Sequence, residues 1–179
     1  MQPRIPRQSA GEQDGRRPDG TDAGVRFSAE LATVVSGARR RAVRDGDRQV
    51  DTAHLLHSLL EYDPEARAVL GDGPQVARLL GYLVQRSIGY GLRWQSAVED
   101  SGALPVVTGV TGFSPLAATA MEDACARARR RGWAQACGVD LLAALVLDPQ
   151  ARAVEVLGRA AVDARTVLAR AEDHFESTP

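Results

Sequence analysis

The chain has 179 residues and a formal net charge of −1, and hydrophobic residues make up 44% of it while aromatic residues make up only 4%. This composition suits one core of Leu, Val and Ala, which favours helices over a β-sandwich, and it gives no global basic charge for nucleic acid. All 22 basic residues are Arg, which excludes a Schiff-base lysine and a P-loop ATPase of the usual kind.

The chain opens with a polar stretch rich in Gly, Pro and Arg, residues 1–24. Such a segment cannot bury enough apolar surface to fold, so we expect a disordered tail followed by one domain over 25–179. Neither a signal peptide nor a membrane-length apolar run is evident, and the sequence therefore predicts a cytoplasmic protein.

An internal repeat organises the rest of the chain. The phrase DPEARAV begins at Asp63 and DPQARAV begins at Asp148, and Phe27-Ser28 aligns with Phe113-Ser114. Apolar residues recur at helical spacing in both halves. We therefore predict an all-α fold of two tandem four-helix repeats, 27–88 and 113–176, which are related by a pseudo-two-fold axis and share one core. The linker 89–112 contains Trp94, which we expect to pack into the seam.

Helix starts carry the clearest chemical signals. Ser28 and Ser114, the latter followed by Pro115, are predicted N-caps, and each could serve as a cap alone or also hold an anion at the helix N-terminus. Further structural caps are expected at helix starts in both repeats: Thr52, with His54 hydrogen-bonded nearby, Asp63 and Asp148.

Metal and catalytic sites are not predicted, and neither is a cofactor. His54 and His57 are spaced to share one helical face, but no third ligand is near in sequence, and we expect His57 to point to solvent. Ser58, His54 and Asp51 have the residue types of a catalytic triad, but the sequence has no strained-turn motif that would present the serine. Cys125 and Cys137 have no metal-type spacing and do not indicate a disulfide framework.

Two Arg clusters, 38–44 and 126–131, end the first helix of each repeat. Arg at a helix C-terminus complements the helix dipole and covers apolar surface with its stem. Alternatively, these arginines contact a peptide carboxylate or a phosphate. Nucleic-acid binding has less support, because no aromatic platform accompanies the charge.

Together, the duplicated FS helix start, the Gly after the first helix and the run DTAHLLHSLL resemble the Clp N-terminal domain, the double-repeat module of ClpC- and ClpA-type Hsp100 unfoldases. The resemblance covers about 27–176 and implies an all-helical, non-catalytic docking platform for adaptors and substrates. No ATPase module accompanies it here, which suggests a free-standing domain.

The resemblance also implies ligand sites around Phe27, Ser28, Phe113, Ser114 and Pro115. In ClpC-type domains these surfaces bind phosphoarginine and cyclic-peptide antibiotics of the cyclomarin kind. The Glu that holds the guanidinium in that family is replaced by Ala53 and Val139, so phosphoarginine binding should be weak or absent. Phe27 and Phe113 could be exposed anchors or could pack beneath the helix starts.

We therefore expect a protein- or peptide-binding module of the Clp protease system, whose partners are unfoldase or protease components, substrates or adaptors, and cyclic peptides. It would act as an adaptor, a docking competitor or an antibiotic-sequestering decoy. The alternative is a small regulator that binds nucleic acid or an acidic partner through its Arg clusters.

Overall fold

A computed structural model describes residues 25–88, 94, 99 and 112–177. The predicted tail, 1–24, and most of the predicted linker lie outside these residues. The elements follow the chain in this order: β1 (Arg26–Phe27), α1 (Ala29–Asp45), β2 (Gln49–Val50), α2 (Thr52–Tyr62), α3 (Pro64–Leu70), α4 (Gly73–Ser87), β3 (Gly112–Phe113), α5 (Pro115–Arg130), β4 (Gln135–Ala136), α6 (Gly138–Leu145), α7 (Arg152–Arg159) and α8 (Ala164–Glu176).

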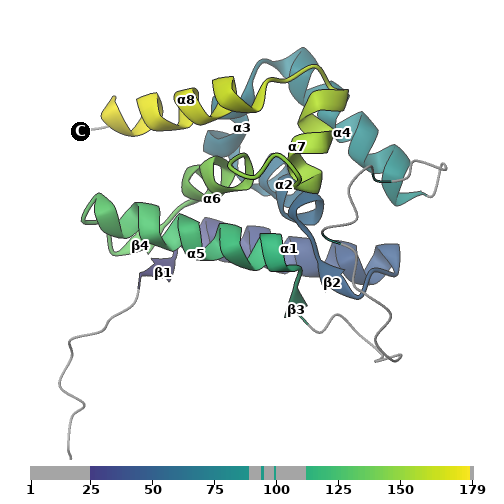
Figure 1. The fold of residues 1–179 in the computed structure, drawn as a ribbon, viewed down its shortest axis with the longest axis horizontal. Coiled ribbons are helices and arrows are strands. Elements are labelled where there is room, and N and C mark those ends of the chain that lie inside the picture. Colours follow the sequence, from purple (N-terminus) through teal and green to yellow (C-terminus); the bar gives the residue numbers. More distant parts are fainter. Residues whose placement is uncertain (1–24, 89–93, 95–98, 100–111, 178–179) are drawn as a thin grey trace, which may run out of the picture.

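The all-α prediction of two four-helix repeats is confirmed, with α1–α4 in the first repeat and α5–α8 in the second. The central helices are α2 and α6, whose residues are buried on nearly every side (Figure 1). The other six helices cover this pair, which therefore lies in the middle of the core. None of the helices in the described ranges is long and apolar enough to cross a bilayer.

The first helix of each repeat packs through one stripe, as its periodicity predicts. Buried positions are spaced three and four residues apart on both helices, namely Leu31, Val34, Ala38 and Ala42 on α1 and Ala117, Ala120, Met121, Ala124 and Ala128 on α5. The α1 helix ends at Gly46, and Gly132 follows α5. Both residues have the positive φ that glycine adopts most easily.

Two short parallel strand pairs join the repeats, and the sequence did not predict them. In the first, β1 pairs with β4 and Phe27 lies opposite Ala136, whereas in the second β2 pairs with β3 and Val50 lies opposite Phe113. Each pair thus joins the strand before the first helix of one repeat to the strand before the second helix of the other. The two strand pairs are therefore equivalent under the pseudo-two-fold relation between the repeats.

Two predicted caps need correction. The N-cap of α2 is Asp51, whose Oδ1 accepts the N–H of His54 at 2.8 Å, and Thr52 is already the first helical residue. In repeat two, Asp148 does not start the third helix, because its carboxylate accepts the N–H of Gln150 in a turn and α7 begins only at Arg152.

The corresponding Asp63 does cap α3, by accepting the N–H of Ala66 at 2.9 Å. Its Oδ2 also lies against Gly138, the first residue of α6. A side chain at that glycine would overlap the Asp63 carboxylate and approach Leu59. Because Asp63 is buried and fixed by its cap, it has little room to move away.

Gly138→Ala should therefore lower the free energy of unfolding by about 1–3 kcal/mol, because the new methyl group overpacks the contact between α6 and the start of α3. Urea unfolding followed by far-UV circular dichroism measures the change. Gly158→Ala is the matched control, since this exposed helical glycine has open space around it and should gain up to about 1 kcal/mol. Equal stability of the two variants would contradict the packing described for Gly138.

Candidate functional site

One buried carboxylate, that of Glu99, lies where the two repeats meet. Glu99 is only 2% exposed. Its Oε2 accepts the backbone N–H of Thr52 at 2.8 Å and the hydroxyl of Ser114 at 2.7 Å. Its Oε1 accepts the backbone N–H of Arg152 at 2.7 Å and the hydroxyl of Thr52. These donors come from the N-termini of α2 and α7 and from the N-cap of α5.

This arrangement is an anion site at helix N-termini, and the protein fills it with its own side chain. Helix N-termini present backbone N–H groups and partial positive charge, which suit a carboxylate or a phosphate. Ser114, predicted as a ligand-binding residue, is fully buried and is engaged with Glu99. Sequence reasoning missed Glu99, which lies in the linker and belongs to no periodic pattern.

A buried ion pair continues the cluster. Arg152 Nη1 lies 2.7 Å from Asp51 Oδ2, and both side chains are almost wholly buried. Trp94 from the linker contacts the guanidinium groups of Arg86, at 3.6 Å from the ring centroid, and Arg152, at 4.9 Å. Trp94 is partly buried against the core, in the seam where it was predicted. The linker is thus attached at Trp94 and Glu99.

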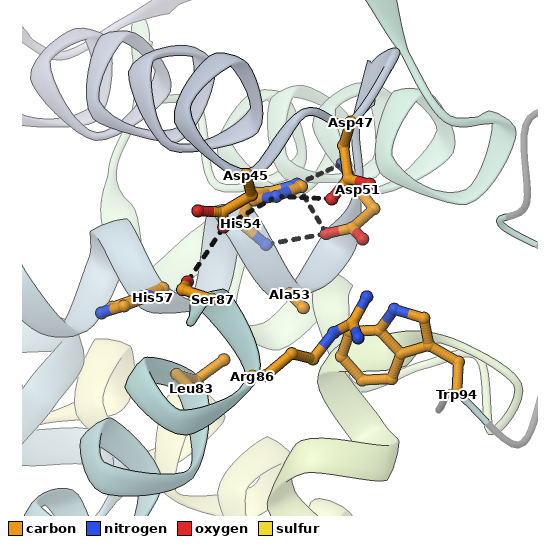
Figure 2. A pocket seen from close by; sticks show the side chains of 10 residues that line it. All are labelled: Asp45, Asp47, Asp51, Ala53, His54, His57, Leu83, Arg86, Ser87 and Trp94. Atoms are coloured by element: carbon orange, nitrogen blue, oxygen red, sulfur yellow. Dashed lines mark hydrogen bonds and ion pairs between the residues drawn. The ribbon is translucent and has the colours of Figure 1, made fainter. Parts of the chain in front are cut away.

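An acidic pocket of about 160 Å³ adjoins this seam (Figure 2). Three carboxylates surround the buried imidazole of His54. Nε2 lies 3.2 Å from Asp47 Oδ2 and 3.6 Å from Asp45 Oδ2, and Nδ1 lies 2.9 Å from Asp51 Oδ1. The hydroxyl of Ser87 on α4 donates a hydrogen bond to Asp45 Oδ2 at 2.9 Å.

The charges in this pocket favour a protonated His54. Burial alone would lower its pKa, but hydrogen bonds to Asp45, Asp47 and Asp51 outweigh burial and raise the pKa to about 11. Burial likewise opposes ionisation of Asp51, yet its contacts with His54 and Arg152 hold its pKa well below the usual value. Nε2 of His54 then faces Asp45 and Asp47, while Nδ1 lies beside Asp51 Oδ1 and 3.1 Å from the backbone N of Asp51.

His57, one turn further along α2, is in a different state. It is buried rather than exposed to solvent as predicted. Burial and the charges of Arg41 and Arg44 lower its pKa to about 4, although Glu61 acts in the opposite direction. His57 is therefore neutral near pH 7, whereas His54 is charged.

The same pocket contains candidate metal ligands and two members of the candidate triad, His54 and Asp51. Asp47, Asp51 and His54 each offer one ligand atom, and these atoms lie within 4.8 Å of one another. The contacts of His54 with Asp47 and Asp51 account for this cluster without an ion. The Oγ of Ser58 is fully buried and makes no hydrogen bond within the described part of the chain, so the structure does not bring it into a triad with His54.

The other predicted ligand residues lie on two separate surfaces, which Figure 1 places at opposite ends of α1 and α5. At one, Phe27 is 38% exposed and Ser28 Oγ accepts the N–H of Leu31 at 3.1 Å. At the other, Pro115 is exposed, while Phe113 is partly buried with Arg39 above its ring at 4.9 Å. The structure therefore splits the predicted set between the two strand pairs.

No protein-family model matches the sequence, and no curated protein matches it. Solved structures do match. The N-terminal domain of the caseinolytic protease associated chaperone ClpD from Arabidopsis thaliana is similar, with 22% identity, a TM-score of 0.63 and coverage of 85% of this chain and 96% of that one. The Hsp104 N-terminal domain from Candida albicans is similar at 12% identity, with a TM-score of 0.65 and coverage of 86% and 93%.

A structure from a malarial protein secretion system is also similar, with 15% identity, a TM-score of 0.62 and coverage of 86% of this chain and 97% of that one. At these identities the likeness establishes the fold. The chain has the fold of a Clp N-terminal domain along nearly the whole of that domain, as the resemblance in sequence predicted.

Glu99→Ala should lower the free energy of unfolding by about 3–5 kcal/mol, because it leaves buried donors on Thr52, Ser114 and Arg152 without their acceptor. Glu122→Ala on the exposed face of α5 is the control and should change it by less than about 0.5 kcal/mol. Chemical denaturation of both variants measures the difference. A loss no larger than that of the control would show that the carboxylate does not join the repeats.

His54 should make stability depend on pH in the alkaline range. Its folded pKa, about 11, lies above the unfolded value near 6.5. Its contribution is therefore complete below about pH 6.5 and is lost as the pH rises toward 11. The stability gap between the natural chain and His54→Gln should narrow by about 3 kcal/mol from pH 6 to pH 9, measured by urea unfolding.

His57→Gln is the control for this experiment. Because the folded pKa of His57 is lowered to about 4, its effect on stability falls between about pH 4 and pH 6.5. This variant should keep the alkaline trend of the natural chain. A gap for His54→Gln that stays constant from pH 6 to pH 9 would mean that His54 is not charged in the folded state.

Proposed function

We propose that the chain is a non-catalytic module that binds proteins or peptides in a cytoplasmic Clp-type protease system. The observation that carries the proposal is the fold, which matches the N-terminal domains of ClpD and Hsp104 over 96% and 93% of their length. The role is that of an adaptor, a docking competitor or a decoy that sequesters cyclic-peptide antibiotics. The partners are unfoldase or protease components, substrates and adaptors.

The Phe27 surface is the better of the two predicted ligand surfaces. Phe27 is 38% exposed and Ser28 is partly buried, whereas Ser114 is completely buried beneath Glu99. An exposed aromatic side chain beside a helix N-terminus offers a partner both apolar contact and backbone donors. We therefore assign the partner and the cyclomarin-type peptide first to the surface around Phe27.

Phosphoarginine should bind weakly or not at all. The positions that would hold its guanidinium carry Ala53 and Val139, and both are buried apolar residues. The helix start at Ser114 is also occupied by a carboxylate, which would repel a phosphate. Neither repeat therefore supplies both halves of such a site.

The alternative, a regulator that binds nucleic acid, has less support. Arginines in both clusters already face carboxylates: Arg41 pairs with Glu61, Arg44 with Asp45, Arg127 with Glu172 and Arg131 with Asp140. Paired arginines release fewer counterions when they meet phosphate, so they contribute less to binding.

Calorimetric titration of the full chain with a ClpC-type unfoldase should show saturable binding, and Phe27→Ala should weaken it about fivefold or more through the loss of an exposed aromatic contact. A cyclomarin-type peptide should bind the chain, and a phosphoarginine peptide should not. Val43→Ala is the matched control, because Val43 is a 62% exposed apolar residue on α1, away from that surface.

Absence of unfoldase binding at micromolar concentrations would overturn the proposal. A degradation assay with the matching protease then separates the roles, since an adaptor accelerates substrate loss and a docking competitor slows it. Low-salt binding to DNA that falls steeply with added salt would favour the nucleic-acid alternative.

A further inference from the structure

An open groove of about 700 Å³ lies in repeat one, on another face of α2 from the seam. Its floor is apolar and includes Leu60 on α2 and Leu80 on α4. Val84 and Ile88, at the end of α4, line it while being 49% and 63% exposed. Large apolar side chains that border a groove and face solvent are typical of a surface that receives a partner.

The wall of the groove is basic. Arg41 and Arg44 reach it from α1 and Arg67 from α3. Glu61 is the acidic residue among those that line it and neutralises Arg41, while His57 at its base is uncharged near pH 7. Arg67 has no ion-pair partner within the described part of the chain, and its Nε is buried without a hydrogen bond. The groove therefore offers apolar contact beside a net positive charge.

Repeat two contains a filled version of this site. There, α8 places Phe175 against the guanidinium of Arg131, at 3.6 Å, and edge-on to Trp133, at 5.6 Å between centroids. One turn earlier on the same helix, Glu172 lies 3.6 Å from Arg127. An aromatic ring and a carboxylate from one helix thus cover the end of α5.

Alignment of the repeats shows what repeat one lacks. Asp72 and Asp163 are the N-caps of α4 and α8, and counting from them puts Val84 at the position of Phe175. The same count puts Gly81 at the position of Glu172. Arg41 is the counterpart of Arg127 but pairs with Glu61, and Asp45 is the counterpart of Arg131. Repeat one therefore lacks the ring, and Arg67 is the groove arginine that forms no ion pair within the described residues.

We propose that this groove binds a helical segment of a partner protein that carries an aromatic residue with a carboxylate one turn before it. The ring packs against the apolar border formed by Val84 and Ile88, and the carboxylate pairs with Arg67. Residues 1–24 of the chain itself do not fit this description, because they contain no aromatic residue. The inference rests on the proposed role in protein binding, but it concerns a surface distinct from that of Phe27.

The test uses the full chain and a fluorescent Ala-based helical peptide of about 14 residues with the pattern Glu-x-x-Phe. Anisotropy should show saturable binding that weakens about tenfold when the peptide Phe is replaced by Ala. Val84→Phe should weaken binding about tenfold or more, because it fills the groove as Phe175 does in repeat two. Arg67→Glu should weaken it comparably and reduce its salt dependence.

Val43→Phe is the matched control, since it makes the same change at an exposed position on α1 outside the groove and should leave binding unchanged. Thermal unfolding establishes that each variant is folded. Peptide binding that survives both Val84→Phe and Arg67→Glu, or no binding at all to the natural chain, would overturn the inference. The proposed function is tested separately by the unfoldase titration with Phe27→Ala, which does not use the groove variants.

Discussion

The structure depends on one buried carboxylate that two repeats and a linker must satisfy together. Glu99 loses its hydration on burial, and donors from Thr52, Ser114 and Arg152 offset that cost. Because those donors begin three helices drawn from both repeats, neither repeat can provide the site alone. Elsewhere between the repeats, the buried carboxylate of Asp63 at the start of α3 lies against Gly138, the first residue of α6.

The two repeats also preserve one electrostatic contact while reversing its polarity. In repeat one, Asp45 at the end of α1 faces His54 at the start of α2. In repeat two, the corresponding residues are Arg131 and Asp140, which form an ion pair with the acid on the other side. The two repeats thus share the attraction at this place but not the residue types. The reversal has a consequence, because an arginine at that position can support Phe175, whereas an aspartate cannot.

The sequence predicted the helices because local rules determine them. Apolar spacing set the buried stripe of α1 and α5, and Ser28, Asp63 and Gly46 marked helix ends through hydrogen bonds that reach only a few residues. Glu99 could not be found this way, since nothing local distinguishes a linker glutamate that reaches across the fold. The same limit explains why Asp148 was wrongly predicted to cap a helix. Its local sequence matches that of Asp63, but Asp148 forms a turn, and the next helix begins at Arg152, whose N–H binds Glu99.

Two pairs of corresponding surfaces differ between the repeats. The helix start at Ser114 is occupied by Glu99 of the linker, and the end of α5 is covered by Phe175. Phe27 beside Ser28 stays exposed, and the groove bordered by Val84 stays open, so repeat one leaves the matching surfaces available. Covering apolar surface in repeat two adds burial that favours the folded state of a domain of this size. The difference between the two near-copies follows from individual residues on a common scaffold, such as Phe175 at the position of Val84.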